Sequence, residues 1–548
     1  MIGERARLGL LERALAALAL AAAFSVSPPA SAHALGRIPI TAVHSSDGIL
    51  RLTDEGVTDL ASIDPPSGEA GDAQSNLVES LVFGGLVRLD ANLRVQPNAA
   101  SSWTVSDGGK TYTFTMRRGL RFADGAPVTS ADVVYSLNRA FGAEFQAGNT
   151  DYYLGHIVGG VDVTNKKAMT VRGVRALGPD RVRITLDQPT AVILDQLAYA
   201  VADIVPRRII RAYGRAWTDH AVGIGPFRVS HWAHGRAIDL APNRYYWRGT
   251  PRLRGIHIVF VPDANTAYKL YRSGAVDVTG AAQFADNHLP DVQGEADLHE
   301  QAQLFTEYLT PNEHAAPFNN ILVRQAFSAA INRATVARLL HNKVLPASGI
   351  LPPGMPGFDQ WLSGQTFDPL RARRLLARAG YPNGKGLPTI TLDIDGGDPE
   401  GQTKGNVLRE FWALVLGVRV RLRRLPHRAY NDALTARHYQ LAFIAWGADY
   451  PDPQNFLSLQ LQTDSGNNNG GYSDAMFDRL TERADTIVNN DAERYRLYHR
   501  AEQIAIDEAA WIVLDWGKAD VLIRPTVHGL IVNALGVTAP NWTTVTKG

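Results

Sequence analysis

Cysteine is absent from all 548 residues of the chain. Without thiols the chain forms no disulfide and no thiolate metal site, and it has no cysteine to which a lipid is attached. A protein of this size is therefore stabilised mainly by its hydrophobic core. Hydrophobic residues make up 45% of the sequence, enough for such a core, and the length suits two or three domains of roughly 150 residues each.

An excess of charge of one sign is also missing. The sequence contains 55 lysine and arginine residues against 54 aspartate and glutamate residues, for a net charge of +1. This balance argues against a polyanionic partner, so we expect no nucleic-acid groove. Beyond the N-terminal region, no segment has the ~18 consecutive apolar residues that a membrane-spanning helix needs.

Most motifs of known catalytic chemistry are missing as well. Residues 106–112, SDGGKTY, contain Gly-Lys-Thr, but Thr104 stands where a phosphate-binding loop requires glycine. A strand pattern follows, so Asp107, Gly108 and Gly109 are predicted to form a hairpin turn. The histidines form no H-E-x-x-H zinc motif, and there is no G-x-S-x-G nucleophile elbow. We therefore expect a protein that is not an enzyme, with no cofactor and no metal.

The N-terminus has the pattern of an export signal. Arg5, Arg7 and Arg13 precede an Ala/Leu-rich stretch at residues 14–26, and Ala-x-Ala sequences end at position 32 or 34. The pattern predicts a signal peptide over residues 1–34 and a periplasmic mature chain without a lipid anchor. A membrane anchor or a first core helix is the alternative, although the apolar stretch is short for a bilayer.

Alternation and capping patterns predict a mixture of strands and helices. Residues 111–116 and 181–186 alternate apolar and polar side chains, which is the period of a half-buried strand. Thr129, with Asp132 three residues later, has the pattern of a capping box at the start of a helix over residues 130–141. Because no repeat or long linker marks a boundary, the pattern indicates only α/β or α+β lobes.

The segment AWGADYPDP, residues 445–453, is unusual for a loop. It follows an apolar run and places two carboxylates, Asp449 and Asp452, among a tryptophan, a tyrosine and two prolines. It fits a catalytic pair, a metal site, a plain turn or a pocket for a cation. The sequence shows no partner residues for the first two, so the turn and the cation pocket remain.

Several segments resemble one family, and they occur in its order. They are residues 81–140, beginning LVFGGLVRLDANLRVQPNAASSW, and then GIGPFRVSHWAHGRAIDLAPNRYYW, YRSGAVDV, PFNNILVRQAFSAAINR, FDPLRARRLLARAGYPNG and, after the AWGADYPDP loop, YSDAMFD. Together they are similar to the family 5 extracellular solute-binding proteins of ABC importers, which include binders of oligopeptides, dipeptides and nickel.

The resemblance implies a fold and a division into domains. The fold is α/β, with two lobes that close on a ligand like a flytrap and an extra subdomain in lobe I. The expected parts follow from this: lobe I at residues 35–83, 206–303 and 520–548, the extra subdomain at 84–205, and lobe II at 304–519.

The resemblance also assigns roles in the AWGADYPDP loop. Asp449, three residues after Trp446, is at the position that holds the α-ammonium group of a bound peptide in peptide-binding members. A buried ammonium needs a paired carboxylate, because an isolated charge in a dry site is very costly. The backbone of Ala445, Trp446 and Gly447 is expected to pair with an extended peptide as an added strand.

The opposite edge of the bound peptide is expected to contact Glu69, Ala70 and Gly71. The resemblance further places Tyr308 and Asn312 where the family lines its cleft.

One position departs from the pattern of some oligopeptide binders. They have an arginine three residues before the tryptophan, whereas this chain has Phe443, so Arg437 is the candidate for the ligand carboxylate. A surface role for Arg437 is the alternative. Asp449 has the alternative of capping the turn toward Asn455, and Asp452 is expected to be structural.

The expected function is that of a monomeric periplasmic solute-binding subunit. It would capture an oligopeptide or dipeptide and deliver it to ABC permease subunits in the inner membrane, driven by cytoplasmic ATPases. The alternatives are a binder of a nickel chelate, an opine or a sugar, and a secreted hydrolase that uses Asp449 and Asp452 as an acid–base pair.

Overall fold

The computed structural model describes residues 47–67, 73–142, 145, 150–281 and 283–548. The predicted signal peptide and the predicted ligand residues Glu69, Ala70 and Gly71 lie outside these ranges. Over the described ranges, no helix combines the length and the apolar character needed to cross a membrane.

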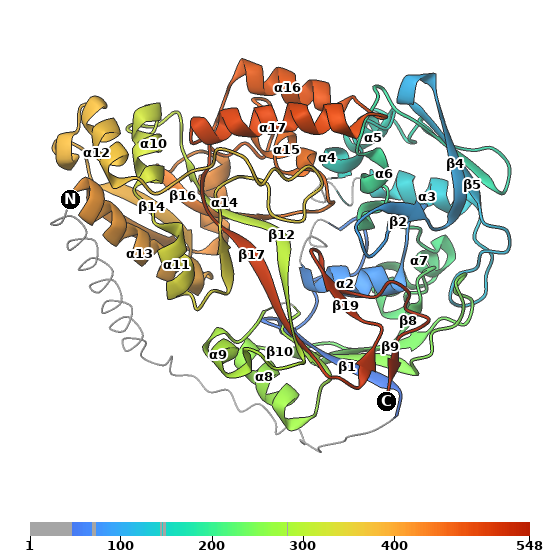
Figure 1. The fold of residues 1–548 in the computed structure, drawn as a ribbon. Coiled ribbons are helices and arrows are strands. Elements are labelled where there is room, and N and C mark those ends of the chain that lie inside the picture. The colour runs from blue at the N-terminus through green and yellow to red at the C-terminus, as the bar shows by residue number, and fades with distance from the viewer. Residues whose placement is uncertain (1–46, 68–72, 143–144, 146–149, 282) are drawn as a thin grey trace.

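Two long antiparallel strands form the centre of the molecule (Figure 1). They are β12 (Leu298–Pro311) and β17 (Ile512–Ile523), and they pair from Leu298↔Leu522 to Leu309↔Ile512. Their register shifts between Ala302 and Thr306, about halfway along. The chain passes from one half of the molecule to the other within these two strands.

An 11-stranded sheet extends from this pair in both directions. Beyond β12 it contains β16 (Leu441–Gly447), β14 (Ile390–Asp395) and β15 (Val420–Leu425), whereas β13 (Val344–Pro346) pairs with the edge of β17 that faces away from β12. On the other side it contains β11 (Val278–Thr279), β1 (Ile49–Glu55), β10 (Gly255–Val261), β9 (Ala237–Pro242) and β8 (Phe227–Ala233). We call the half with β14 lobe II and the half with β1 lobe I.

The two lobes have separate hydrophobic cores. In lobe I, Leu52, Ile256 and Phe227 belong to one cluster beneath β1 and β10. In lobe II, one cluster lies under β14 and β16 and a second around Tyr498. The lobe II helices that cover these clusters are α10 (Ile321–Ala329), α12 (Pro369–Arg378), α13 (Pro399–Leu416), α16 (Ala475–Asp485) and α17 (Asp491–Asp507).

A second sheet forms a third unit beside lobe I (Figure 1). Its four strands are β4 (Ala100–Ser106), β5 (Thr111–Met116), β7 (Arg181–Thr185) and β6 (Val174–Ala176), in that order. We call the segment from β2 (Val87–Leu89) to η4 (Ala200–Ala202) the small subdomain. Its own core contains Phe114, Leu137 and Ile184.

Local predictions in the small subdomain are confirmed. Asp107–Gly109 forms a single 3-10 turn between β4 and β5, with Gly108 at φ 64, so the segment is a hairpin turn and not a phosphate-binding loop. Helix α3 (Ser130–Ala140) begins with the expected capping box, in which the Thr129 amide donates to Asp132 at 2.8 Å.

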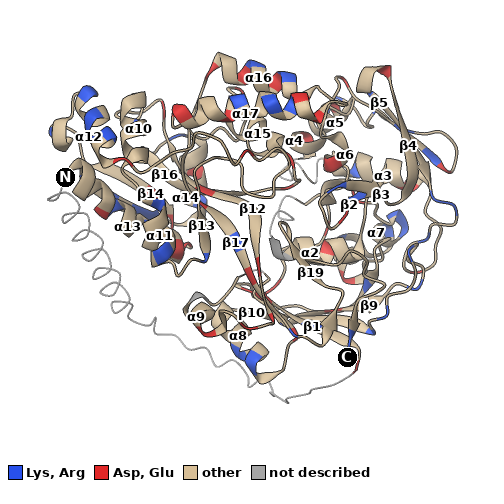
Figure 2. Cartoon of the chain, viewed as in Figure 1, with Lys and Arg blue, Asp and Glu red and all other residues tan. Residues whose placement is uncertain are grey.

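Charges of both signs are distributed along the helices of both lobes (Figure 2). In lobe II, the Lys404 side chain of α13 is only 1% exposed and pairs with Asp515 of β17, with Glu400 one turn earlier and with Glu307 of β12. Glu307 and Asp515 stand opposite each other in the β12–β17 ladder. Burial acts to lower the pKa of Lys404, but the three carboxylates outweigh it and hold the pKa above its ordinary value. One ammonium thus attaches α13 to both central strands.

We predict that Lys404→Met destabilises the protein by about 3–5 kcal/mol, because the buried carboxylates of Glu307 and Asp515 then have no cation between them. Urea unfolding measures the change. Lys385→Met, at an exposed position, is the matched control and should stay within about 0.5 kcal/mol of the parent. A loss below about 1 kcal/mol for Lys404→Met would contradict this account of the cluster.

Candidate functional site

The C-terminal half of β16 forms a sheet edge at the start of the AWGADYPDP loop. β16 pairs with β12 along its whole length, but with β14 only at Leu441 and Ala442. The Ala448 amide donates to the carbonyl of Leu304 in β12, so the alternate residues Ala445 and Gly447 direct their N–H and C=O groups away from β12. Both residues are exposed, and the described residues place no second strand beside them.

Asn455 connects the two main side chains of the loop. Its amide oxygen accepts from the Trp446 indole at 2.9 Å and from the Asp449 backbone amide at 3.2 Å. Its amide nitrogen donates to the Asp449 carboxylate at 3.1 Å. Because Asn455 is fully buried, it holds Trp446 and Asp449 in one arrangement.

Asp452 positions Asn455. It caps the 3-10 helix η8 (Pro453–Asn455) by accepting from the Gln454 amide at 2.9 Å, and it forms a buried ion pair with Arg494 of α17. The carboxylates of Asp449 and Asp452 therefore contact different partners. The interpretation of Asp452 as a structural residue agrees with these contacts.

Tyrosines of the small subdomain lie over Asp449. Tyr199 donates to the Asp449 carboxylate at 3.3 Å, and Tyr153 of α4 (Thr150–Leu154) also hydrogen-bonds to it. The Tyr153 ring centroid is 5.1 Å from that of Tyr199 and 6.4 Å from that of Tyr450. Asp449 is thus surrounded by aromatic side chains from the small subdomain and from lobe II.

The charge of Asp449 is not balanced within the site. No lysine, arginine or histidine forms an ion pair with it in the part of the chain that the structure describes. Burial raises the pKa of Asp449 above its usual value, and hydrogen bonds from Asn455, Tyr153 and Tyr199 oppose the rise. A half-buried carboxylate with neutral donors only is suited to receive a cation.

Tyr152 also links the small subdomain to lobe II. Its hydroxyl donates to the Leu459 carbonyl at 3.3 Å and accepts from Gln460 at 3.3 Å and from Asn467. The Ala191 amide forms a further link to the Asp485 carbonyl at 2.8 Å. These contacts hold the small subdomain against lobe II beside Asp449.

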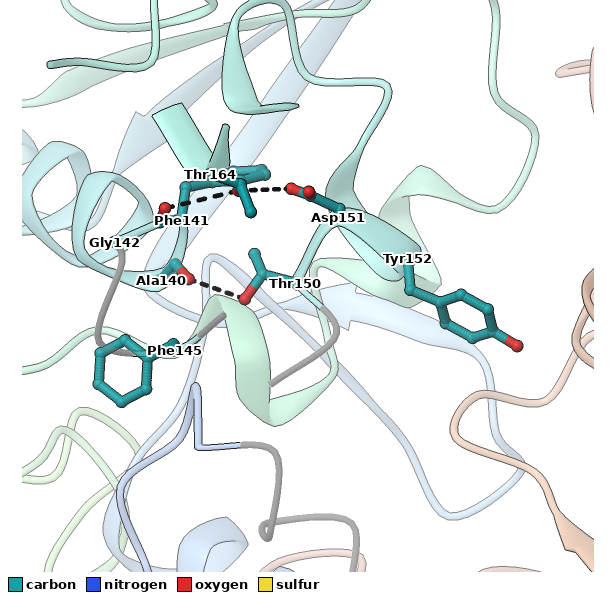
Figure 3. Close-up of a pocket in the computed structure, with 8 residues that line it drawn as sticks. All are labelled: Ala140, Phe141, Gly142, Phe145, Thr150, Asp151, Tyr152 and Thr164. Carbon is teal, nitrogen blue, oxygen red and sulfur yellow. Dashed lines mark hydrogen bonds between the residues drawn. The ribbon is translucent and has the colours of Figure 1, made fainter. Parts of the chain in front are cut away.

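A cavity of about 380 Å³ adjoins Tyr152 within the small subdomain (Figure 3). Its walls contain Phe141, Phe145 and Asp151, and the Asp151 carboxylate accepts from the Thr164 hydroxyl at 2.7 Å. The Tyr152 ring points away from these side chains.

The other residues predicted to bind ligand have contacts within the protein. Tyr308 is 2% exposed and stacks on Trp511 with ring centroids 3.5 Å apart. Asn312 is buried and donates to the carbonyls of Arg437 and Tyr439 at 2.8 and 2.9 Å. Arg437 donates to the Asn468 and Asn469 carbonyls, at 2.9 Å for the first. The ligand role of these three residues stays a prediction.

Sequence patterns did not identify the residues that the small subdomain contributes to the site. Tyr153, Tyr199 and Gln196 lie about 250 positions or more before Asp449 and Tyr450, and they belong to no motif. Tyrosine is common in cores, so its type alone gave no signal. Asn455 had a weak signal, because it ends the turn in which Asp449 was expected.

Comparisons with known proteins identify the family of the chain. The profile of the family described as bacterial extracellular solute-binding proteins, family 5 Middle, matches residues 94–468. The chain is 30% identical to the probable deoxycholate-binding periplasmic protein YgiS of Escherichia coli K12, covering 86% of this chain and 89% of that protein. It is 28% identical to the oligopeptide-binding protein OppA of Bacillus subtilis, covering 80% and 83%.

A solved structure shows the same fold. The periplasmic oligopeptide-binding protein OppAIV of Borrelia burgdorferi superimposes with a TM-score of 0.75 at 25% identity, covering 90% of this chain and 99% of that one. The two-lobed fold is therefore that of a periplasmic binding protein, as expected. With the profile match over most of its length, the chain belongs to family 5 of the bacterial extracellular solute-binding proteins.

Proposed function

We propose that this protein is the periplasmic solute-binding subunit of an ABC importer, and that it captures a peptide between its lobes. The peptide is an oligopeptide or a dipeptide with a free α-ammonium group. The protein itself performs no chemistry on the peptide; it delivers the peptide to permease subunits in the inner membrane. The names of the oligopeptide-binding relatives support a peptide as the solute.

The single observation on which the proposal rests is the state of Asp449. The carboxylate is enclosed by Tyr153, Tyr199 and Asn455, which are neutral hydrogen-bond donors. A peptide ammonium would supply the missing positive charge, and the π-faces of the surrounding tyrosines would add to its attraction. A solute without a cation would leave this charge uncompensated in the closed cleft.

The free edge of β16 supports the same class of solute. The outward N–H and C=O groups of Ala445 and Gly447 are spaced as in a strand that accepts a neighbour. An extended peptide that pairs antiparallel with them would place its N-terminus toward Asp449, two residues beyond Gly447. Main-chain pairing of this kind gives affinity without reading the side chains of the peptide.

We predict that Asp449→Asn weakens binding of a peptide with a free N-terminus by about 2–5 kcal/mol, because the ammonium then has no charged partner. Isothermal titration calorimetry measures the loss. Asp464→Asn, at an exposed position near the loop, is the matched control and should bind as the parent does. The N-acetylated peptide, which has no ammonium, should bind the parent and Asp449→Asn equally; an unchanged affinity for the free peptide would rule out the ammonium site.

The pH dependence of binding follows from the raised pKa of Asp449. The ammonium pairs only with the ionised carboxylate, so affinity is full above the pKa and is lost as the pH falls through it. Burial places this pKa above the usual 3.8, so we expect the loss to begin at a higher pH than for an exposed aspartate. Titrations across the acidic range check this, and Asp449→Asn should show a flat profile in the same range.

Backbone pairing predicts an effect of N-methylation. A methyl group on the peptide nitrogen that faces Ala445 or Gly447 removes one hydrogen bond and should cost about 0.5–1.5 kcal/mol or more of binding free energy. The next nitrogen points away from β16, toward the edge at which Glu69, Ala70 and Gly71 are expected, so the reference is the unmethylated peptide. An affinity equal to that of the unmethylated peptide would contradict strand addition on β16 while leaving the ammonium site untouched.

A further inference from the structure

Three arginines meet at the junction of the small subdomain and lobe I. Arg88 lies in β2, and Arg117 directly follows β5, both in the small subdomain. Arg248 lies in the turn between β9 and β10 of lobe I. The site shares no residue with the Asp449 site, and its argument is independent of the proposed function.

Trp247 brings two of these guanidinium groups together. Its ring packs against the core of the small subdomain, and its indole donates to Asn98 at 3.0 Å. The Arg117 guanidinium carbon lies 3.6 Å from the Trp247 ring centroid, and that of Arg248 lies 5.8 Å from it. The guanidinium groups of Arg117 and Arg248, which come from two distant segments of the chain, therefore both lie against the Trp247 ring.

The donors of these arginines are only partly used. Arg117 donates through Nε to the Asn98 carbonyl at 2.6 Å, and Arg248 donates to the Pro540 carbonyl at 3.2 Å and to the Tyr246 hydroxyl. Arg88 donates to the Leu89 carbonyl at 3.1 Å. Its Nε atom, however, is fully buried and has no acceptor among the described residues. A buried donor without an acceptor indicates a missing partner.

The uncompensated positive charge of the three arginines also favours the binding of an anion. No carboxylate of the described residues lies within ion-pairing distance of Arg88, Arg117 or Arg248. The nearest acidic side chain, Asp90, already accepts from the Arg94 amide at 3.0 Å and from Gln96 at 3.1 Å. Burial, and next the charge of Arg248, lower the pKa of both Arg88 and Arg117. The three cations thus destabilise one another in the absence of an anion.

We propose that Arg88, Arg117 and Arg248 form a binding site for a small oxyanion with the geometry of phosphate. An oxyanion with several acceptor oxygens satisfies the orphaned Arg88 donor and the free donors of the other two arginines at once. Since Arg88 and Arg117 belong to the small subdomain and Arg248 to lobe I, the bound anion links the two parts. Its binding therefore stabilises the folded protein.

Inorganic phosphate is the probe for this site. We expect the melting temperature of the full chain to rise with phosphate concentration and to saturate, when sodium chloride keeps the ionic strength constant. Arg88→Gln and Arg248→Gln should each weaken phosphate binding about tenfold or more, because each removes a charge-assisted donor. Arg252→Gln, at an exposed position of the same turn, is the matched control and should keep the full effect.

A second measurement distinguishes a lipid headgroup from a free anion as the source of the oxyanion. Vesicles that contain an anionic phospholipid are sedimented with the protein, beside vesicles of a zwitterionic lipid. Binding to the anionic vesicles that is lost in Arg88→Gln and Arg248→Gln assigns the site to a lipid headgroup; a phosphate effect without vesicle binding assigns it to a free anion. A phosphate effect no larger than that of chloride, together with vesicle binding that the two variants leave unchanged, would overturn the proposal.

Discussion

The pairing of β12 with β17 is the constraint on which the rest of the structure depends. These are the strands in which the chain passes between the lobes, and both halves of the 11-stranded sheet extend from them. β16 is hydrogen-bonded to β12 over its full length, so the position of the Asp449 loop is set by the central pair. The ammonium of Lys404 stabilises this region by joining α13 to a carboxylate on each strand.

A series of polar contacts connects helix α17 to the candidate site around Asp449. Arg494 on α17 pairs with Asp452, Asp452 caps the short helix that ends in Asn455, and Asn455 holds Asp449 and Trp446. Each step lies in buried surroundings, where an unpaired polar group is costly, so the arrangement is rigid before a solute arrives. Asp449 is the carboxylate of this network that has no ion-pair partner among the described residues.

Local sequence patterns predicted local structure well. Alternation identified β5 and β7, the capping box identified the start of α3, and the Asp-Gly-Gly turn was distinguished from a phosphate loop by the strand after it. The resemblance of ordered segments predicted the two-lobed fold. The contacts of Tyr308 and Asn312 were not predictable in this way, because a strand pattern does not tell which buried neighbour, such as Trp511, a side chain will meet.

The sequence by itself determined the family and the mixed α/β fold, and it selected the AWGADYPDP loop as the candidate site, because these depend on patterns within segments of a few to some tens of residues. It also predicted different roles for the two aspartates of the loop: a structural role for Asp452, which lies between two prolines, and a ligand role for Asp449. Only the tertiary structure decided which groups surround Asp449, since Tyr153 and Tyr199 reach it from the small subdomain, far away in the chain. The same is true of the two arginines at Trp247, which come from two separate segments. Contacts between such distant segments arise from packing and burial of the whole chain, and no local pattern records them.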